Sequence, residues 1–418
     1  MDTLLVFLIQ MALILVATRC GSHVATRLHV APVLGEIVAG IALGPTVFGL
    51  LLPRLQLTLF PGPGSVPDEM LQSMSWMGLI LLMFIGGLDV DTGLLRRNLR
   101  CALLIASGAL ACTMALGVGV AGVLPLELLP EQGHTASRIF VALALAITAI
   151  PVLIKILLDL GLLSTPFGAT IIVAGVVADT VGWILLGMLA RATTVGYSLH
   201  QTLTSLGLVA VFLLCTFTLG HLFFIRLVKL QRRRDDLSVN FLAAVMVLML
   251  IGASVTHTLG LHPVLGAFAI GLMVGRWRLS ESIKHKLEGF AFAFFVPVFL
   301  ANLGLRANLL LLSSWKAWGT VLLLTGASSL SMLVGGAVGA RLGGLGTWES
   351  LGAGVGLITN GAMGLVAARL GHDLGLIPST MYSALVVVAV ARTLLAAVGL
   401  QLLRSRLAAD QAEARRDP

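Results

Sequence analysis

The sequence predicts an all-α polytopic membrane protein, and three observations carry this prediction. Apolar residues make up 58% of the 418 residues, and charged residues only 11%, whereas a soluble domain carries about 25% charged residues. The mean hydropathy is +1.02, so lipid must replace water around most of the surface. A helix needs about 20 apolar residues to span a bilayer. Thirteen segments qualify, of which the ninth is short: 3–18, 32–52, 71–88, 101–124, 137–157, 167–190, 199–225, 239–258, 263–275, 288–305, 317–340, 350–368 and 379–403.

The placement of basic residues predicts the topology of these spans. If the amino terminus lies outside, 20 Lys and Arg side chains fall in inner loops or the tail and 6 fall in outer loops. This bias follows the positive-inside rule. It predicts a multi-pass protein of the cell's inner (plasma) membrane with a cytoplasmic carboxyl terminus. The net charge of +8 therefore reflects topology and the lipid bilayer, and we expect no nucleic-acid partner.

Three sequence motifs recur along the chain and predict an internal repeat. Each one pairs a span with the span seven places later, so the second copy enters the membrane from the opposite face, as in many secondary transporters. We expect a membrane domain over 1–405, made of repeat one (about 1–191), a linker helix (about 199–225) and repeat two (about 238–405), followed by a short tail, 406–418. Compositional coincidence is the alternative. The matching segments are 32–35 with 263–266, 159–162 with 373–376, and 177–180 with 390–393.

Two of the spans contain residues that interrupt helices. Span five carries Thr148 and Pro151, and span twelve carries Thr359, Asn360 and Gly361 at the corresponding place. Proline removes a backbone donor and clashes with the preceding turn, and unwound backbone at membrane depth needs polar partners. Broken helices at matching places in two halves indicate a binding site near the midplane. The alternative is a simple proline kink together with a glycine packing notch.

Three charged residues within the apolar spans are candidates for a functional or structural role. Asp179 stands in the middle of span six, where a carboxylate costs roughly 2.5–3.5 kcal/mol on insertion scales, so it must be paired, hydrated or used. Burial favours its neutral form and a nearby cation favours the charged form, so the residue can hold a proton or, transiently, Na⁺ or K⁺. A purely structural carboxylate is the alternative. Arg392 is its counterpart in repeat two and a candidate ion-pair partner, unless it faces a water-filled vestibule; Glu36 is a candidate structural acid.

Four stretches of the chain resemble a known family. They are 34–45, 78–91, 147–153 with 160–163, and 294–299 with 304–306. On these motifs the chain resembles bacterial monovalent cation:proton antiporters of the second cation:proton antiporter family, which have a sodium/hydrogen exchanger-like membrane domain. The resemblance implies a core domain that slides against a dimerisation domain in a homodimer. It also implies that Asp179 is the shared carboxylate for cation and proton.

The chain departs from the family's pattern around this carboxylate. Ala178 stands where the family has Asn, Asp or Gln, Met332 where it often has lysine, and Asn360 where it often has a basic residue. Arg392 replaces a small residue and is a candidate for a relocated basic partner.

Together these observations predict a secondary antiporter that exchanges Na⁺ or K⁺ for H⁺ by alternating access at Asp179. The cation and proton bind through Asp179, Thr148, Thr359 and Asn360, while Pro151 and Gly361 set the helix breaks. We expect no catalysed reaction and no cofactor. Two alternatives remain: a degenerate antiporter fold that serves as a membrane sensor or partner subunit, and a carrier of an organic or anionic solute docked on Arg392.

Overall fold

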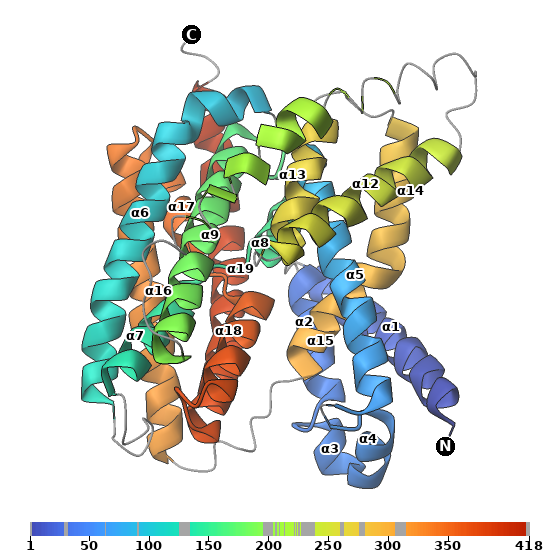
Figure 1. The fold of residues 1–418 in the computed structure, drawn as a ribbon. Helices are drawn as coiled ribbons and strands as arrows, with labels where there is room; N and C mark the ends of the chain where they lie inside the picture. Colours follow the sequence, from blue (N-terminus) through green and yellow to red (C-terminus); the bar gives the residue numbers. More distant parts are fainter. Residues whose placement is uncertain are drawn as a thin grey trace.

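The computed structural model confirms an all-helical membrane protein. It describes residues 2–28, 32–62, 64–89, 92–124, 134–194, scattered positions between 204 and 226, 239–259, 263–275, 281–305 and 315–414. Every regular element within these ranges is a helix (Figure 1). Ten described helical stretches, three of them made of consecutive helices, are long and apolar enough to cross a membrane. The helix that begins at Thr3 starts at one side of the molecule, and the helix that ends at Ala414 finishes at the opposite side (Figure 1).

The helices form two groups that stand side by side in Figure 1. The first bundle packs around α6 and α16, which run against each other along much of their length, and α7, α9, α17 and α19 pack around this pair. Its interior is filled by aliphatic side chains and almost no charge. The first bundle consists of α6 (Thr92–Val123), α7 (His134–Ala146), α8 (Ile150–Leu160), α9 (Pro166–Thr194), α16 (Trp315–Leu342), α17 (Thr347–Leu357), α18 (Gly361–Asp373) and α19 (Ser379–Ala414).

The second bundle is organised around α5 packed on α13 and α2 packed on α1 and α15. Here α14 continues through a π-helical turn, Ala291–Phe295, into α15. A second π-helical turn, Thr216–Gly220, lies in the predicted linker 199–225, of which 199–203 and several later positions fall outside the described residues. The second bundle consists of α1 (Thr3–Arg27), α2 (Pro32–Leu43), α3 (Phe48–Leu51), α4 (Pro53–Leu59), α5 (Val66–Asp89), α12 (Val239–Thr258), α13 (Pro263–Gly275), α14 (Glu281–Phe290) and α15 (Val296–Leu305).

The helix boundaries correct the sequence prediction in two places. The stretch Pro32–Leu51 is long and apolar enough to be the predicted span 32–52, but it is interrupted, because α2 ends at Leu43 and the chain turns through Gly44 and Pro45 into the short helices α3 and α4. The predicted first span, 3–18, is too short, because α1 continues to Arg27. The sixth, eighth and ninth spans appear as α9, α12 and α13.

Two glycine pairs bring helices of the second bundle into backbone contact. A methyl group added at Gly35 would overlap the carbonyl of Gly21, and one added at Gly266 would overlap the carbonyl of Gly252. The first pair joins α2 to α1, and the second joins α13 to α12. Small residues that allow such close approach are typical of helix packing in membranes. The same kind of contact therefore recurs at the two sets of motif-bearing helices.

The two bundles meet along a narrow interface. From the first bundle, α8 packs on α5 and α2, and α18 touches α15. Beside the start of α18, side chains of both bundles enclose a gap that has no room for a water molecule; it is lined by Ile37, Leu303, Gly361, Leu365, Val390 and Thr393.

Candidate functional site

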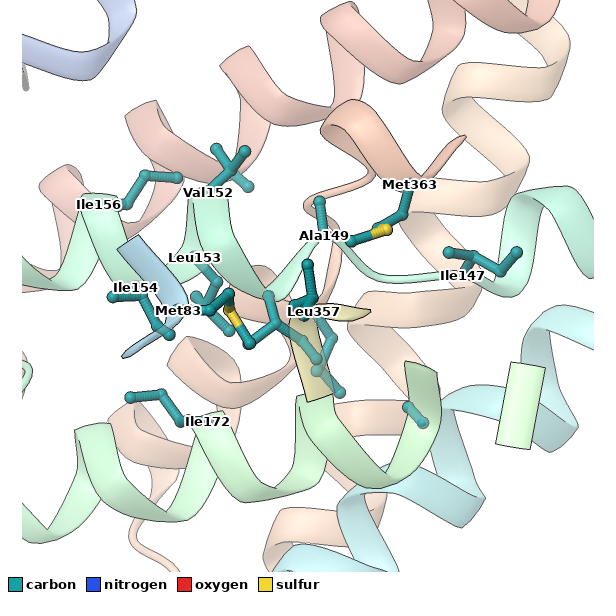
Figure 2. Close-up of a cluster of buried hydrophobic side chains, with 14 of the residues drawn as sticks. Met83, Ile147, Ala149, Val152, Leu153, Ile154, Ile156, Ile172, Leu357 and Met363 are labelled. Carbon is teal, nitrogen blue, oxygen red and sulfur yellow. The ribbon is translucent and has the colours of Figure 1, made fainter. Parts of the chain in front are cut away.

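Two interrupted helices cross inside the first bundle. The first break separates α7, which ends at Ala146, from α8, which begins at Ile150. The second separates α17, which ends at Leu357, from α18. The backbone N–H of Ala149 donates to the carbonyl of Thr359 at 2.8 Å, so the unwound segments pair with each other. Figure 2 shows the extended Ile147–Ala149 segment between helix ends, among buried side chains.

Side chains from each break satisfy carbonyl groups of the other. The last carbonyls of a helix have no partner within it. Thr148 Oγ1 donates to the carbonyl of Leu357 at 3.2 Å, and Asn360 Nδ2 donates to the carbonyl of Ala144 at 3.3 Å. Thr359 Oγ1 donates to Gly356 O at 3.0 Å. These bonds use the hydroxyl and amide hydrogens, so the threonine oxygens keep lone pairs that can face a cation.

Gly361 is required by the geometry of the second break. Its φ is +38°, a conformation that side chains disfavour. A Cβ at this position would lie 2.9 Å from both Ala149 Cβ and Val152 Cγ2, so the residue is also the point where the two breaks touch most tightly. Its N–H donates to Thr393 Oγ1 at 3.0 Å, which satisfies one of the first donors of α18. On the opposite break, Pro151 in the first turn of α8 has no N–H to satisfy.

Asp179 lies on the face of α9 that packs against the crossing. Its side chain is fully buried. Gly175 and Gly182 lie one turn to either side on the same helix face. A methyl group at Gly175 would sit 3.5 Å from Ile150 Cγ1, and one at Gly182 would sit 3.2 Å from Ile147 Cγ1. The carboxylate is therefore placed beside the first break and away from the lipid.

Arg392, on α19, is fully buried next to the same break. Its Nη1 donates to the carbonyl of Leu145 at 2.6 Å, while its Nε and Nη2 have no hydrogen-bond partner among the described residues. A cation at the carboxyl end of a helix is stabilised by the helix dipole, so the guanidinium compensates the interrupted end of α7. The expected ion pair between Arg392 and Asp179 stays a prediction.

Two of the positions that depart from the family pattern are apolar and buried. Ala178, next to Asp179, and Met332, on α16, are both fully buried in the core of the first bundle. The third, Asn360, is 2% exposed, and its Oδ1 accepts no hydrogen bond from the described residues. Among the buried basic groups of the first bundle, Arg392 is fully buried and Lys155 is 9% exposed.

A charged cluster that the sequence interpretation did not assign lies between the bundles. Lys155 Nζ and Asp159 Oδ1 form an ion pair at 2.7 Å, and Asp159 Oδ2 accepts from the backbone N–H of Val33 at 3.0 Å. Glu36 is 6% exposed, and Lys155, Asp159 and Arg19 are the charged groups that act on it most strongly. The sequence does hold a signal for this cluster, because opposite charges four residues apart, Lys155 and Asp159, lie at the end of an apolar run.

The architecture and site define a polytopic membrane protein whose interrupted helices meet beside a buried carboxylate, as in secondary transporters. The family model described as sodium/hydrogen exchanger, transmembrane, matches residues 12–404, and the chain belongs to this family. The resemblance drawn from the sequence is thereby confirmed at the level of the family.

Curated relatives and a solved structure extend this similarity over the whole chain. The chain is 30% identical over 398 residues to the Na⁺/H⁺ antiporter NhaS4 of Synechocystis sp., covering 94% of this chain and 96% of the relative. It is 29% identical to the K⁺/H⁺ antiporter 1 of Saccharomyces cerevisiae, covering 93% of this chain but only 45% of that longer protein. The sodium proton antiporter MjNhaP1 of Methanocaldococcus jannaschii has the same fold, with a TM-score of 0.64, 15% identity and coverage of 98% and 99%.

Proposed function

We propose that this protein exchanges Na⁺ or K⁺ for H⁺ across the plasma membrane by alternating access, with Asp179 as the shared site. The family and the antiporters among its relatives support the class of activity. The observation that carries the proposal is the position of Asp179, fully buried on the face of α9 that packs on the crossing of two broken helices. No covalent bond of the cation is made or broken in this exchange, so the proposed activity is transport and not catalysis.

The exchange follows from competition at one carboxylate. When Asp179 carries a proton it is neutral and compatible with burial. When it loses the proton, its charge is balanced by the incoming cation. Alkali cations prefer oxygen ligands, and we infer that the hydroxyls of Thr148 and Thr359 and the free Oδ1 of Asn360 complete the shell. Proton and cation thus occupy the site in turn, and the cycle is electroneutral.

We infer that the two halves of the chain are inverted repeats, 1–191 and 238–405, joined by the linker 199–225. The paired breaks and the matching Gly21–Gly35 and Gly252–Gly266 contacts support this proposal. In this account the first bundle is the mobile core, and the second bundle forms the homodimer contact. The amino terminus lies outside and the tail, 406–418, is cytoplasmic, as the distribution of basic residues predicts.

The test is proton flux in proteoliposomes that hold a pH-sensitive dye. Addition of Na⁺, K⁺, Li⁺ or Rb⁺ should drive proton movement in the wild-type protein and none above the protein-free background in Asp179→Asn. Glu69→Gln, which removes an exposed carboxylate at the start of α5, is the matched control and should behave as wild type. Unchanged flux in Asp179→Asn would overturn the assignment of the site. A clear dependence of the rate on an imposed membrane potential would overturn electroneutrality.

One observation favours a second candidate, a carrier of an organic or anionic solute. Arg392 has two donors, Nε and Nη2, without partners among the described residues, and an anion would satisfy both. In that case solute binding would be lost in Arg392→Met, and flux driven by cations would be absent in wild type. A degenerate sensor would show neither activity, although it would still fold and insert.

A further inference from the structure

The ion pair between Lys155 and Asp159 joins the two bundles on the side that the basic residues predict to be cytoplasmic. Asp159 belongs to α8 of the first bundle, and its Oδ2 accepts from the first-turn N–H of Val33 in α2 of the second bundle. A carboxylate at a helix amino terminus satisfies an otherwise unpaired donor and is favoured by the helix dipole. Lys155 holds the other carboxylate oxygen at 2.7 Å, and both side chains are about nine-tenths buried.

The same arrangement of residues recurs in the second half of the chain, at the outer end. Arg369 and Asp373 on α18 form an ion pair at 2.9 Å, also at positions i and i+4. Arg369 follows Lys155, and Asp373 follows Asp159, by the same number of residues along the chain. The glycine that follows each pair, Gly161 or Gly375, has nearly the same positive φ, +70° or +68°.

The segment that Asp159 contacts, at the start of α2, also has a counterpart in the second half of the chain. The segment 32–35 that opens α2 recurs as 263–266, which opens α13, so Val264 occupies the place of Val33. Both α2 and α13 begin with a proline followed by this valine. The second half of the chain therefore carries, in sequence, the counterparts of the residues that form the contact between α8 and α2.

The two pairs differ sharply in their surroundings. The side chains of Lys155 and Asp159 are 11% and 9% exposed, whereas those of Arg369 and Asp373 are 57% and 51% exposed. One of the two ion pairs is thus buried and bonded to the other bundle through Asp159, whereas the sequence-related pair is formed but half-exposed.

We propose that Asp159 and Asp373 are alternating latches of the two bundles. Asp159 closes the cytoplasmic side by capping α2 at Val33, and in the opposite state Asp373 closes the outer side by capping α13 at Val264. Lys155 and Arg369 hold the two carboxylates in their capping geometry. This inference rests on the proposed function, because only an alternating-access protein needs both states.

The second contact is tested by disulfide trapping in a background where Cys20, Cys101, Cys112 and Cys215 are replaced by alanine. Asp159→Cys with Pro32→Cys tests the observed latch, and Asp373→Cys with Pro263→Cys tests the proposed one. Under mild oxidation both pairs should cross-link in the membrane, and reduction should restore the separate cysteines. Glu69→Cys with Pro263→Cys, which joins two outer helix starts outside the latch, should not cross-link.

A second variant tests whether the latches alternate. Removal of the cytoplasmic latch by Asp159→Ala should speed cross-linking of the 373–263 pair by about tenfold, since a lost charge-assisted hydrogen bond shifts the two-state equilibrium by that order. Glu69→Ala should leave the rate unchanged. If Asp159→Ala does not yield folded protein, Asp373→Ala at its half-exposed position carries the test, and it should speed cross-linking of the 159–32 pair.

The outcomes separate the latch from the transport activity. If the 159–32 pair cross-links and the 373–263 pair does not, or if Asp159→Ala and Asp373→Ala leave the opposite cross-linking rates unchanged, the alternating latch is wrong. Cation-driven flux in proteoliposomes then decides independently whether antiport stands, because cross-linking requires no transported ion. Cross-linking of both pairs without any flux would support the latch and overturn the proposed exchange.

Discussion

Arg392 and Leu145 are joined by a hydrogen bond from the guanidinium Nη1 to the main-chain carbonyl, 2.6 Å long and fully buried. The contact connects the middle of α19 to the last turn of α7, where the first break begins. It places a formal positive charge at a helix end whose partial charge is negative. The corresponding end of α17 receives the neutral hydroxyls of Thr148 and Thr359 instead. The two breaks are therefore electrostatically unequal.

Replacement of Arg392 should destabilise the fold around the first helix break. In Arg392→Met the carbonyl of Leu145 loses its donor, which costs about 1.5–3 kcal/mol for a hydrogen bond to a charged group. We expect a lower melting temperature for the detergent-purified protein, while Arg404→Met, at an exposed position of the same helix, should melt as wild type. A variant at position 392 that is as stable as wild type would show that the guanidinium does not support the break.

Thr148 should tune cation affinity, since its hydroxyl hydrogen is committed to Leu357 and its oxygen remains an acceptor. Thr148→Val keeps the shape and removes the oxygen. We expect the cation concentration for half-maximal flux to rise about fivefold, equivalent to about 1 kcal/mol. Thr148→Ser retains the hydroxyl and should stay close to wild type. Equal cation affinities for the Val and Ser variants would show that the Thr148 hydroxyl does not bind the cation.

Gly361→Ala should destabilise the protein through both backbone and packing. The positive φ costs about 1–2 kcal/mol for a residue with a Cβ, and the new methyl group meets Ala149 and Val152. Gly319→Ala is the matched control, because nothing lies within 4 Å of a Cβ at that helical position. Thermal melting should show a clear loss for position 361 and no loss for position 319. Equal melting temperatures would contradict the described geometry of the break.

The repeat proposal predicts similar penalties at matching glycines. Gly35→Ala and Gly266→Ala each push a methyl group into the backbone of a neighbouring helix, and overpacking of this kind costs typically 1–3 kcal/mol. Both variants should melt earlier than wild type by comparable amounts. Gly122→Ala, with open space around the added methyl, should not. A penalty at only one of the two glycines would weaken the case for equivalent helices.

Much of the fold could be predicted from hydropathy, because helices in lipid need long apolar runs. The helix breaks could also be located, since Pro151 and Gly361 disrupt regular helix in recognisable ways. The end of α2 was missed because apolar residues continue to Leu52, whereas Gly44 and Pro45 stop the helix locally.

The site was predictable as a set of residues and much less as a set of contacts. Asp179 and Arg392 stand out because charge is costly in an apolar span. The partner of Arg392 is a main-chain carbonyl 247 residues away, which no local pattern encodes. The bond between Asp159 and Val33 likewise depends on how the two bundles dock, and sequence patterns describe the bundles only one helix at a time.

The central claim is that one carboxylate exchanges a proton for a cation. It is tested most directly by titrating the purified protein with NaCl or KCl in weakly buffered solution while protons released are counted. Choline chloride serves as the ionic-strength control. We expect about one proton released per chain in wild type and none in Asp179→Asn. Cation binding without proton release, or the same release from the Asp179→Asn variant, would contradict the account.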